Sequence, residues 1–426
     1  MRPRTIVALD EWLTSAARAR PDHAAVVAEG RAISYAELQE RADRVASRLA
    51  AAPGEHVTTR LPPGLAFCEL LHAVPRRGAV FVPLDPAGSP APKQPAPARP
   101  TAGGLATTVE PDAVHSVIHT SGTTGEPKAV ELTYANHAAS ATAAADALGV
   151  HPDDRWLCPL PLHHVGGLGV LIRCVLNRTT AVVHERFDVD RVRGTLEGGE
   201  VTLASLVPTM LARLREGGLR EAPGLRAIAL GGGPIPAGLV EWARDTGIPV
   251  VPVYGMTETG SQIVAGSPGR PLRGVELEIA ADGEILVRGP MVARGELGSD
   301  GWLHTGDLGR IDADGRLHVE GRLKELIVTG GENVAPLEVE RALLAHPAVE
   351  DAGVAGRPDP EWGEAVTAFV VLSRPATAGE LRAWCRERLA PHKTPKTIHE
   401  VAALPRNAGG KLLRDRLGAA DLRGGR

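Results

Sequence analysis

The chain has 426 residues, of which 47 are lysine or arginine and 51 are aspartate or glutamate, giving a formal net charge of −4. A chain of this length is expected to fold into more than one packed unit, and its balanced charge offers no broad attraction to nucleic acid or to an anionic membrane. The first residues do not resemble a secretory signal, and no apolar run is long enough to span a bilayer. We therefore expect a cytoplasmic protein with small-molecule partners; the oligomeric state stays open, a homodimer included.

The first hundred residues predict a small helical and strand-containing region followed by a linker. Residues 12–19 and 35–51 have helical periodicity around a short strand at 24–30, and Ser34 stands three residues before Glu37, the spacing of a capping box. The stretch 86–104 is too rich in proline for a regular element, so it predicts an extended connector. Between residues 115 and 255, short apolar runs alternate with helical patterns, which favours a largely parallel sheet covered by helices on both faces.

The pattern changes after residue 274. Segments 275–289 and 308–322 each contain an Asp-Gly pair between alternating strands, as hairpins do, and residues 323–426 carry helices and strands of their own. We predict an α/β fold with a large N-terminal domain, residues 1–321, made of helix-covered mixed sheets and a strand-rich subdomain. A small mobile α+β domain, residues 322–426, is expected to follow.

The strongest local motif follows the predicted strand at 115–120. It combines small hydroxyl residues and glycines, which leave backbone N–H groups free to wrap a polyphosphate, with a lysine that supplies positive charge. It lacks the Gly-Lys-Ser/Thr ending of a Walker A loop. We predict that it binds ATP through Thr120, Ser121, Gly122, Thr123, Thr124, Gly125 and Lys128.

This segment resembles the phosphate loop of the superfamily that contains acyl- and aryl-CoA synthetases, peptide-synthetase adenylation domains and luciferases. Further motifs of that superfamily follow in the same order along the chain. The resemblance implies an adenine-contacting turn, a segment that touches phosphate and holds Mg²⁺ through Glu258, a ribose-binding pair, an interdomain hinge and a mobile catalytic lysine. These roles fall on Gly231, Gly232, Gly233 and Pro234; on Tyr254, Gly255, Met256, Thr257 and Glu258; and on Asp307, Arg322, Lys324 and Lys411.

The chemistry of these residue types agrees with the implied roles. Attack of a carboxylate on the α-phosphate of ATP, with pyrophosphate leaving, needs cations and positioned donors more than it needs a base. Lys411 and a Mg²⁺ ion at Glu258 would supply the positive charge. Asp307 can accept both ribose hydroxyls, and Arg322 can reach the same sugar.

His163 and His164 stand where an apolar strand ends in a glycine-rich turn. The resemblance places His164 beside the acyl pocket, where it would gate the carboxylate and its adenylate. No further ligand stands at metal-binding spacing, and His115 and His119 fall on a predicted strand, where a four-residue gap does not align them. We therefore expect no histidine metal site.

Three longer stretches, residues 154–173, 254–264 and 404–414, resemble o-succinylbenzoate:CoA ligases of menaquinone biosynthesis more than the superfamily at large. The resemblance implies an aromatic acid with a second, distal carboxylate. A buried carboxylate requires a partner, for which Arg173 is the candidate, with Ser261 and Gln262 as polar wall residues. The alternative for Arg173 is a helix arginine that faces water.

The resemblance also implies two half-reactions. ATP and the acid first give an acyl-adenylate with Lys411 in the site, and the C-terminal domain then rotates about Lys324. That rotation would present the loop of Gly330, Gly331 and Glu332 beside a tunnel for CoA. One mobile domain would thus serve two steps.

Two departures from the superfamily pattern keep other functions open. Ala129 stands where the phosphate loop ordinarily has glycine, which would matter if the position needs a positive φ, and the N-terminal region is short. The alternatives are an adenylating enzyme for another aryl or short acid, with CoA or a carrier-protein thiol as acceptor, and a non-catalytic nucleotide-binding protein.

Overall fold

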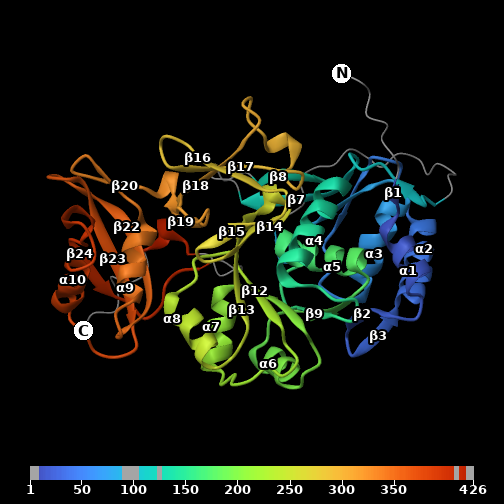
Figure 1. Cartoon of the computed structure of the whole chain (residues 1–426), viewed down its shortest axis with the longest axis horizontal. Helices are drawn as coiled ribbons and strands as arrows, with labels where there is room; N and C mark the ends of the chain where they lie inside the picture. Colours follow the sequence, from blue (N-terminus) through green and yellow to red (C-terminus); the bar gives the residue numbers. More distant parts are fainter. Residues whose placement is uncertain (1–8, 89–104, 122–126, 407–411, 419–426) are drawn as a thin grey trace.

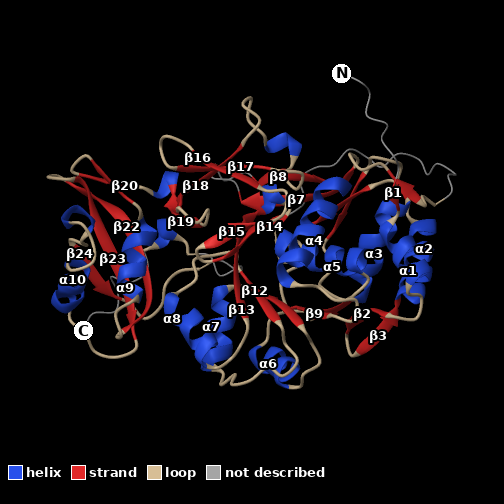
Figure 2. Ribbon diagram, in the orientation of Figure 1, coloured by secondary structure: helices blue, strands red, loops and turns tan. Residues whose placement is uncertain are grey.

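The computed structural model describes residues 9–88, 105–121, 127–406 and 412–418. Most of the proline-rich connector and the segment around Lys411 lie outside these ranges. Figure 1 places the N-terminal elements at one end of an elongated molecule, the strands numbered from β12 to β19 in the middle, and the C-terminal elements at the other end. Figure 2 shows helices gathered around the strands in each of these parts.

One long mixed sheet runs through the large N-terminal part. Its central strands, β13, β12, β11, β9, β10 and β2, pair in parallel, and the strands that extend it on both sides pair antiparallel. The strands lie in the order β16 (Glu276–Ile279), β17 (Glu284–Arg288), β18 (Leu303–Ile311), β19 (Leu317–Arg322), β15 (Gly269–Pro271), β14 (Ser261–Gly266), β13 (Val250–Met256), β12 (Ala227–Leu230), β11 (Leu203–Leu206), β9 (Arg155–Cys158), β10 (Thr180–Val183), β2 (Ala24–Ala28) and β3 (Arg31–Ser34).

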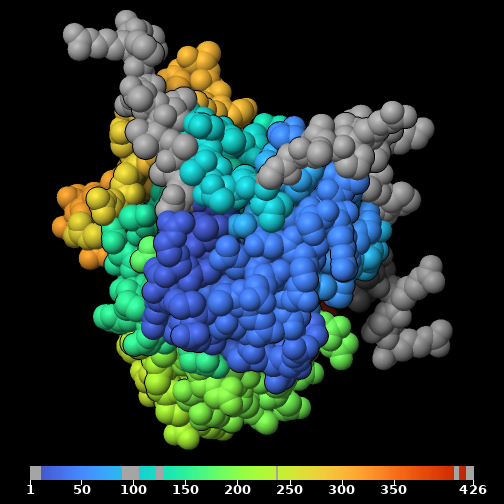
Figure 3. All heavy atoms as spheres, turned by 90° about the vertical axis from the view of Figure 1, so that its right-hand side faces the viewer, coloured from blue at the N-terminus to red at the C-terminus, as the bar shows by residue number. Residues whose placement is uncertain are grey.

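Burial explains the parallel part. Strands β9, β10, β11 and β12 are almost wholly buried, because helices cover both faces, and they read as continuous apolar runs. The covering helices of the N-terminal part are α1 (Trp12–Ala19), α2 (Tyr35–Arg48), α3 (Leu65–Arg76), α4 (Tyr134–Leu148), α5 (Val165–Asn177), α6 (Val189–Glu197), α7 (Pro208–Glu216) and α8 (Ala237–Asp245). In Figure 3 the N-terminal elements form one continuous blue surface at their end of the molecule.

Two smaller sheets complete the N-terminal part. In the four-stranded sheet the first three strands pair in parallel and the last hairpin pairs antiparallel, in the order β4 (His56–Thr59), β5 (Val80–Pro83), β7 (Val114–Ser121) and β8 (Pro127–Thr133). The other sheet pairs β1 (Leu9–Asp10) with β6 (Thr108–Val109). Strands β7 and β8 flank the predicted phosphate loop, so the hairpin fixes where that loop begins and ends.

Local sequence signals account for several boundaries. The Ser34 hydroxyl accepts a hydrogen bond from the Glu37 N–H at 3.2 Å and caps α2, but the Glu37 carboxylate accepts from Arg41, so only half of the expected capping box forms. The two Asp-Gly segments form the hairpins β16–β17 and β18–β19. Short 3₁₀ helices are η1 (Thr257–Thr259), η2 (Arg294–Glu296), η3 (Leu323–Glu325), η4 (Pro391–Lys393) and η5 (Arg414–Arg416).

The C-terminal part has its own sheet and its own hydrophobic core. Its strands are β20 (Ile327–Thr329), β21 (Glu332–Val334), β22 (Val349–Asp359), β23 (Gly363–Leu372) and β24 (Thr397–Glu400), and its helices are α9 (Pro336–Leu344) and α10 (Ala378–Arg386). The α/β class with a small α+β C-terminal domain is therefore confirmed. The chain changes sheet between Arg322 and Ile327, while the domain boundary itself, between residues 321 and 322, remains a prediction.

Candidate active site

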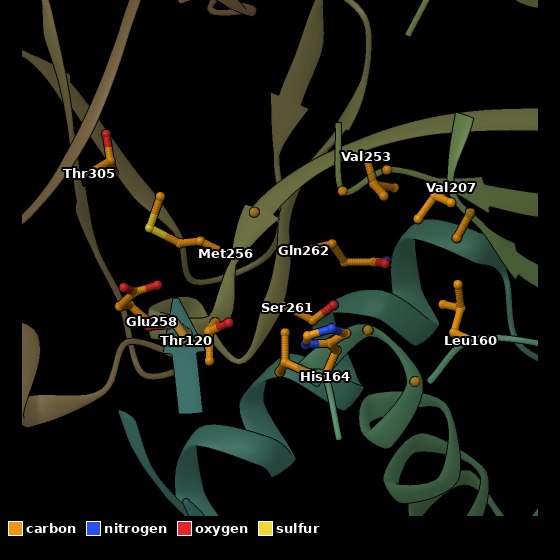
Figure 4. Close-up of a pocket in the computed structure, with 18 of the residues that line it drawn as sticks. Thr120, Leu160, His164, Val207, Val253, Met256, Glu258, Ser261, Gln262 and Thr305 are labelled. Carbon is orange, nitrogen blue, oxygen red and sulfur yellow. The ribbon is translucent and has the colours of Figure 1, made fainter. Parts of the chain in front are cut away.

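A cavity of about 910 Å³ lies where the parallel and antiparallel parts of the long sheet meet. Strands β11, β12 and β13 end at it, and β7, β8, β14, α5, β18 and η3 are among the elements that also line it. Ligand sites of α/β proteins commonly lie at the carboxyl ends of parallel strands. In Figure 4, Glu258 and Thr120 lie toward one end of the cavity, and Leu160, Val207 and Gln262 lie toward the other.

The described part of the predicted phosphate motif lies at this cavity. Thr120, near the end of β7, pairs with Lys128, near the start of β8, and both residues line the cavity. The side chain of Ser121 and residues 122–125 lie outside the described residues. Lys128 forms an ion pair with Glu296 on η2, whose side chain is only 9% exposed. Sequence reasoning missed Glu296, because nothing in its neighbourhood links it to a residue so far away in the chain.

Ala129 does not carry the backbone strain that its position suggested. It lies within the extended strand β8, opposite His119, and it is absent from the non-glycine residues with positive φ. An extended backbone accepts alanine without a conformational penalty. The departure from glycine therefore gives no reason to expect a distorted loop at this position.

The predicted adenine turn begins with Gly231, directly after β12, at a point where the backbone passes too close to strand β13 for a side chain. A Cβ on Gly231 would lie 2.6 Å from Val253 Cγ2 and 2.7 Å from its carbonyl oxygen. Gly231 and Gly232 line the cavity, whereas Gly233 and Pro234 are exposed and do not line it. Close packing between adjacent strands thus brings the first part of this motif to the cavity.

Strand β13 delivers the next motif and ends in the short helix η1. Gly255, Met256, Thr257 and Glu258 line the cavity. A Cβ on Gly255 would lie 2.0 Å from the Ser261 carbonyl oxygen, so this position accommodates only glycine. The tight turn directs η1 back toward the phosphate motif.

The Glu258 carboxylate suits the binding of a cation. Its backbone carbonyl accepts a hydrogen bond from the Ala293 N–H, while within the described ranges its carboxylate has no cationic side chain as a salt-bridge partner. Mg²⁺ is ordinarily held by one or two carboxylates together with substrate phosphates. Glu258 therefore fits a Mg²⁺ ion that arrives with a polyphosphate. In the described part of the chain, no three histidine, cysteine or acidic side chains are grouped to hold a metal.

Asp307 is held from two sides at the edge of this cavity. The Tyr254 hydroxyl donates to Oδ2 at 2.9 Å, and Arg322 Nε lies 3.0 Å from Oδ1 in an ion pair. Burial and the neighbouring carboxylate hold the Tyr254 pKa well above its ordinary value. Asp307 and Tyr254 do not line the cavity, but Arg322 does. The predicted ribose-binding residues are therefore adjacent, with Asp307 fixed before any sugar binds.

The predicted acyl pocket combines two buried donors in the same cavity. Arg173, on α5, is 3% exposed, and its Nε and Nη2 have no hydrogen-bond partner among the described residues. Gln262, on β14, is 4% exposed, and its Nε2 is likewise unpartnered there. Burial lowers the Arg173 pKa to about 10, so the guanidinium remains charged at neutral pH. Of the two interpretations of Arg173, the one that has it facing water is wrong.

His164 and Ser261 line the same cavity as these two donors. His164 is the residue that precedes α5, and its side chain lines the cavity. Burial and the adjacent His163 lower its pKa to about 4. It is a neutral imidazole at pH 7. Ser261 has φ +114°, a strained conformation for a residue other than glycine, and such strain is concentrated at functional sites.

The predicted residues of the C-terminal part are only partly at the cavity. Lys324, on η3, lines it. Gly330 and Gly331 form the exposed turn between β20 and β21, Glu332 is the exposed first residue of β21, and none of the three lines the cavity. Lys411 lies outside the described residues. Sequence reasoning also missed Glu284 and His304, which line the cavity beside the Asp307 turn.

One cavity at the carboxyl ends of parallel strands thus brings together a predicted phosphate motif, a carboxylate that fits Mg²⁺ and the turn that carries Asp307, and this combination is typical of a nucleotide-binding enzyme. The AMP-binding enzyme family matches residues 13–92 and 89–296, and the AMP-binding enzyme C-terminal domain matches residues 338–411. The chain belongs to the AMP-binding enzyme family. No described helix is long and apolar enough to cross a bilayer.

Two curated relatives within this family are similar to the chain over most of its length. The 2-succinylbenzoate–CoA ligase of Bacillus subtilis is 45% identical over 334 residues, which cover 72% of this chain and 69% of that protein. The 2-succinylbenzoate–CoA ligase of Bacillus cereus is 36% identical over 478 aligned residues, covering 96% of this chain and 98% of that protein.

Solved structures of the o-succinylbenzoate CoA synthetase from B. subtilis have the same fold. Its complex with the acyl-adenylate intermediate has a TM-score of 0.86 at 36% identity and covers 97% of this chain and 98% of that chain. Its complex with ATP and magnesium also has a TM-score of 0.86, covering 96% and 100%. A double mutant bound to a product analogue, at the same 36% identity and with 96% and 98% covered, has a TM-score of 0.69.

Proposed function

We propose that this chain is an ATP-dependent o-succinylbenzoate:CoA ligase, which forms an acyl-adenylate and then the CoA thioester. The observation that carries the choice of acid is the pair of buried donors, Arg173 and Gln262, in the cavity that also contains the nucleotide motifs; both have nitrogens without a partner among the described residues. An unpaired guanidinium in a protein interior is strongly disfavoured unless a ligand supplies its counter-charge. The distal carboxylate of o-succinylbenzoate is such a counter-charge.

In the first half-reaction, a carboxylate oxygen of the acid attacks the α-phosphorus of ATP, and pyrophosphate leaves. Thr120 and Lys128 would contact the phosphates at the end of the cavity where Glu258 lies. A bound Mg²⁺ would neutralise polyphosphate charge beside Glu258. Asp307, fixed by Tyr254 and Arg322, would hold the ribose, so that binding energy is used to orient the α-phosphate.

The acid would lie between the nucleotide and Arg173. Because burial keeps His164 uncharged at neutral pH, its imidazole would not form an ion pair with the reacting carboxylate. It can still donate or accept one hydrogen bond, which suits a gating role. The neighbouring Ser261 and Gln262 would complete the polar wall.

In the second half-reaction, the CoA sulfur attacks the acyl carbonyl carbon, and AMP leaves. We propose that the C-terminal domain rotates about Lys324 between the steps, bringing Lys411 to the first and the turn of Gly330, Gly331 and Glu332 to the second. The two TM-scores, 0.86 with the adenylate complex and 0.69 with the CoA-analogue complex, support an arrangement here that is closer to the first. The exposed position of Gly330 and its neighbours, away from the cavity, agrees with that arrangement.

The partners we propose are therefore the acid, ATP with Mg²⁺, and CoA. A cytoplasmic location, a homodimer and the absence of nucleic-acid and membrane partners remain predictions from the sequence. A carrier-protein thiol in place of CoA is the alternative acceptor.

The test is turnover of ATP and CoA with o-succinylbenzoate beside benzoate, an aliphatic acid and an amino acid. We expect pyrophosphate release and thioester formation with o-succinylbenzoate at a kcat/KM at least about a hundredfold above the others, the scale of one charge-assisted hydrogen bond in a buried site. Preference for another acid would overturn the proposed substrate. Adenylate formation without a CoA thioester would overturn CoA as the proposed acceptor. ATP binding without pyrophosphate release for any acid would overturn the proposal that the chain is an enzyme.

The half-reactions are separated by Lys411→Ala. We expect this variant to lose adenylate formation while it converts supplied acyl-adenylate and CoA to the thioester at a rate close to that of the unmodified chain. An equal loss in both half-reactions would exclude the two-arrangement mechanism.

A further inference from the structure

The turn that presents Asp307 is attached to the neighbouring strand β17 by two hydrogen bonds. The Thr305 hydroxyl donates to the Ile285 carbonyl at 2.7 Å, and the Asp307 N–H donates to Thr305 Oγ1 at 3.0 Å. The N–H of Gly306, which has φ +68°, donates to Glu284 Oε1 at 2.7 Å. The position of Asp307 therefore depends on the placement of the Glu284 carboxylate.

His304 is the cationic side chain that pairs with Glu284. Its Nδ1 lies 2.8 Å from Glu284 Oε2, and its Nε2 lies 3.1 Å from Asp300 Oδ2. A neutral imidazole can donate from one nitrogen only, so two carboxylate partners require the doubly protonated ring. The Glu284 side chain is only 10% exposed, and a carboxylate buried to that extent needs such a partner.

We propose that protonated His304 is a positioning residue for nucleotide binding: it fixes Glu284, and Glu284 fixes the Gly306–Asp307 turn against the ribose. This role rests on the proposed function only in that Asp307 holds the sugar. Deprotonation of His304 leaves one of the two carboxylates without a donor, which weakens the hydrogen bonds that hold Glu284 and the Gly306–Asp307 turn in place. Binding of the nucleotide is then weaker at high pH.

The charges around His304 favour its protonated form. The hydrogen bonds from Glu284 and then Asp300 raise the His304 pKa above its ordinary value. Because the folded-state pKa is raised, the imidazolium persists to a higher pH than that of an unperturbed histidine and is lost as the pH rises through that pKa. The other charged or titratable groups on β18 and the elements packed against it are Glu276, Glu278, Arg288, Asp307, Arg310, His318, Glu320, Arg322, Lys324 and Glu325.

The experiment measures the dissociation constant of AMP by calorimetry between about pH 6.5 and about pH 9, for the full chain and for His304→Gln. We expect the variant to bind AMP about tenfold more weakly at the low end, the scale of one charge-assisted hydrogen bond. The ratio of the two dissociation constants should fall toward one as the pH rises, because the native imidazole loses its charge. Comparing the two proteins at each pH cancels the titration of the AMP phosphate.

The matched control is His318→Gln. His318 also pairs with a carboxylate, at 2.8 Å from Asp312 Oδ2, but it does not line the cavity. We expect this variant to keep the AMP affinity and pH profile of the unmodified chain. A structural role for any histidine–carboxylate pair would instead move both variants alike and would overturn the proposal.

Glu284→Gln provides the second arm. Its neutral amide can still accept the Gly306 N–H, so we expect a smaller loss of AMP affinity than loss of both the Gly306 and the His304 contacts of Glu284 would give. We also expect no pH-dependent difference between this variant and the double variant with His304→Gln. An AMP affinity and pH profile of His304→Gln equal to those of the unmodified chain would overturn the proposal even if Glu284→Gln fails to fold. AMP binding needs no acid, so a negative result here is distinct from a wrong substrate.

Discussion

Arg341 and Val319 are joined by a hydrogen bond that crosses the predicted hinge. Arg341 Nη2, on α9, donates to the Val319 carbonyl, on β19, at 2.7 Å. Val319 belongs to the large N-terminal part and Arg341 to the C-terminal part, so the two residues lie on opposite sides of Lys324 in the chain. A rotation of the C-terminal domain about Lys324 has to break this bond, so it stabilises the present arrangement only.

Replacing Arg341 with Met keeps the apolar stem and removes the donor. We expect adenylate formation to slow by about two- to tenfold, the scale of one hydrogen bond, while thioester formation from supplied acyl-adenylate keeps its rate. Single-turnover measurement of each half-reaction checks this. Arg382→Met is the control, because Arg382 Nη2 makes a comparable bond to the Lys396 carbonyl at 2.8 Å within the C-terminal domain. Equal slowing of both half-reactions by Arg341→Met would contradict the expectation.

Tyr254→Phe removes the hydroxyl that orients Asp307 Oδ2 and leaves the ring in place. We expect AMP to bind about fivefold more weakly, because one hydrogen bond to a charged group is lost, and calorimetry measures the change. Tyr35→Phe is a matched control: its hydroxyl bonds the Cys174 and Thr179 carbonyls in the core, away from the cavity. That variant should lower the unfolding temperature without changing AMP affinity. Unchanged AMP affinity in Tyr254→Phe would show that Asp307 keeps its position without the Tyr254 hydroxyl.

Arg173→Met tests the pocket through two opposite effects. Loss of the guanidinium should raise the KM for o-succinylbenzoate about a hundredfold and leave that for benzoate nearly unchanged, because only the first acid has a distal carboxylate. Arg173 has no carboxylate partner among the residues that the structure describes, so removal of its buried charge should raise the free energy of unfolding by about 1 kcal/mol or more. Steady-state kinetics and urea denaturation measure the two quantities.

The control for that variant is Arg213→Met. Both arginines lie over an aromatic ring, Arg173 at 5.8 Å from Trp156 and Arg213 at 5.3 Å from Phe187, but Arg213 is exposed and does not line the cavity. We expect no change in the KM for either acid. An equal rise for both acids in Arg173→Met would mean that Arg173 shapes the cavity without binding the carboxylate.

The sequence was sufficient for the parts of the site that depend on local structure. The phosphate motif follows a strand, and the segment of Thr257 and Glu258 ends another, so both could be placed from apolar runs and motif order. Arg173 was left undecided between a pocket and a water-facing helix position, because helical periodicity in a helix buried on most sides does not single out one face. Its burial became evident only from the packing of α5 in the core.

The remainder of the site depends on contacts between residues far apart in the chain. Glu296 reaches Lys128 across 168 positions, and Glu284 reaches Gly306 from a different strand. No local periodicity or motif encodes such pairs. The concern about Ala129 arose from a family pattern alone and disappears because its backbone is extended.

Buried histidines make the stability of the large domain sensitive to acid. Burial lowers the pKa of His72 to about 4 and that of His137 to about 3, from an ordinary value of 6.5. Because these folded-state values lie below the unfolded one, the stability they contribute is present above pH 6.5 and is lost as the pH falls from there toward their folded-state values. Protonation then favours the unfolded chain, where the imidazole is solvated.

His72→Leu isolates this effect for one group. Between pH 7 and pH 5 the unmodified chain should lose about 2 kcal/mol more of its free energy of unfolding than this variant does, as follows from the two pKa values. Urea denaturation at the two pH values measures the difference, which cancels the titration of every other group that the variant keeps. Substitution of the exposed His151 by Asn is the control and should leave the pH dependence unchanged. The same loss in His72→Leu and in the unmodified chain would mean that His72 is not the group protonated on unfolding.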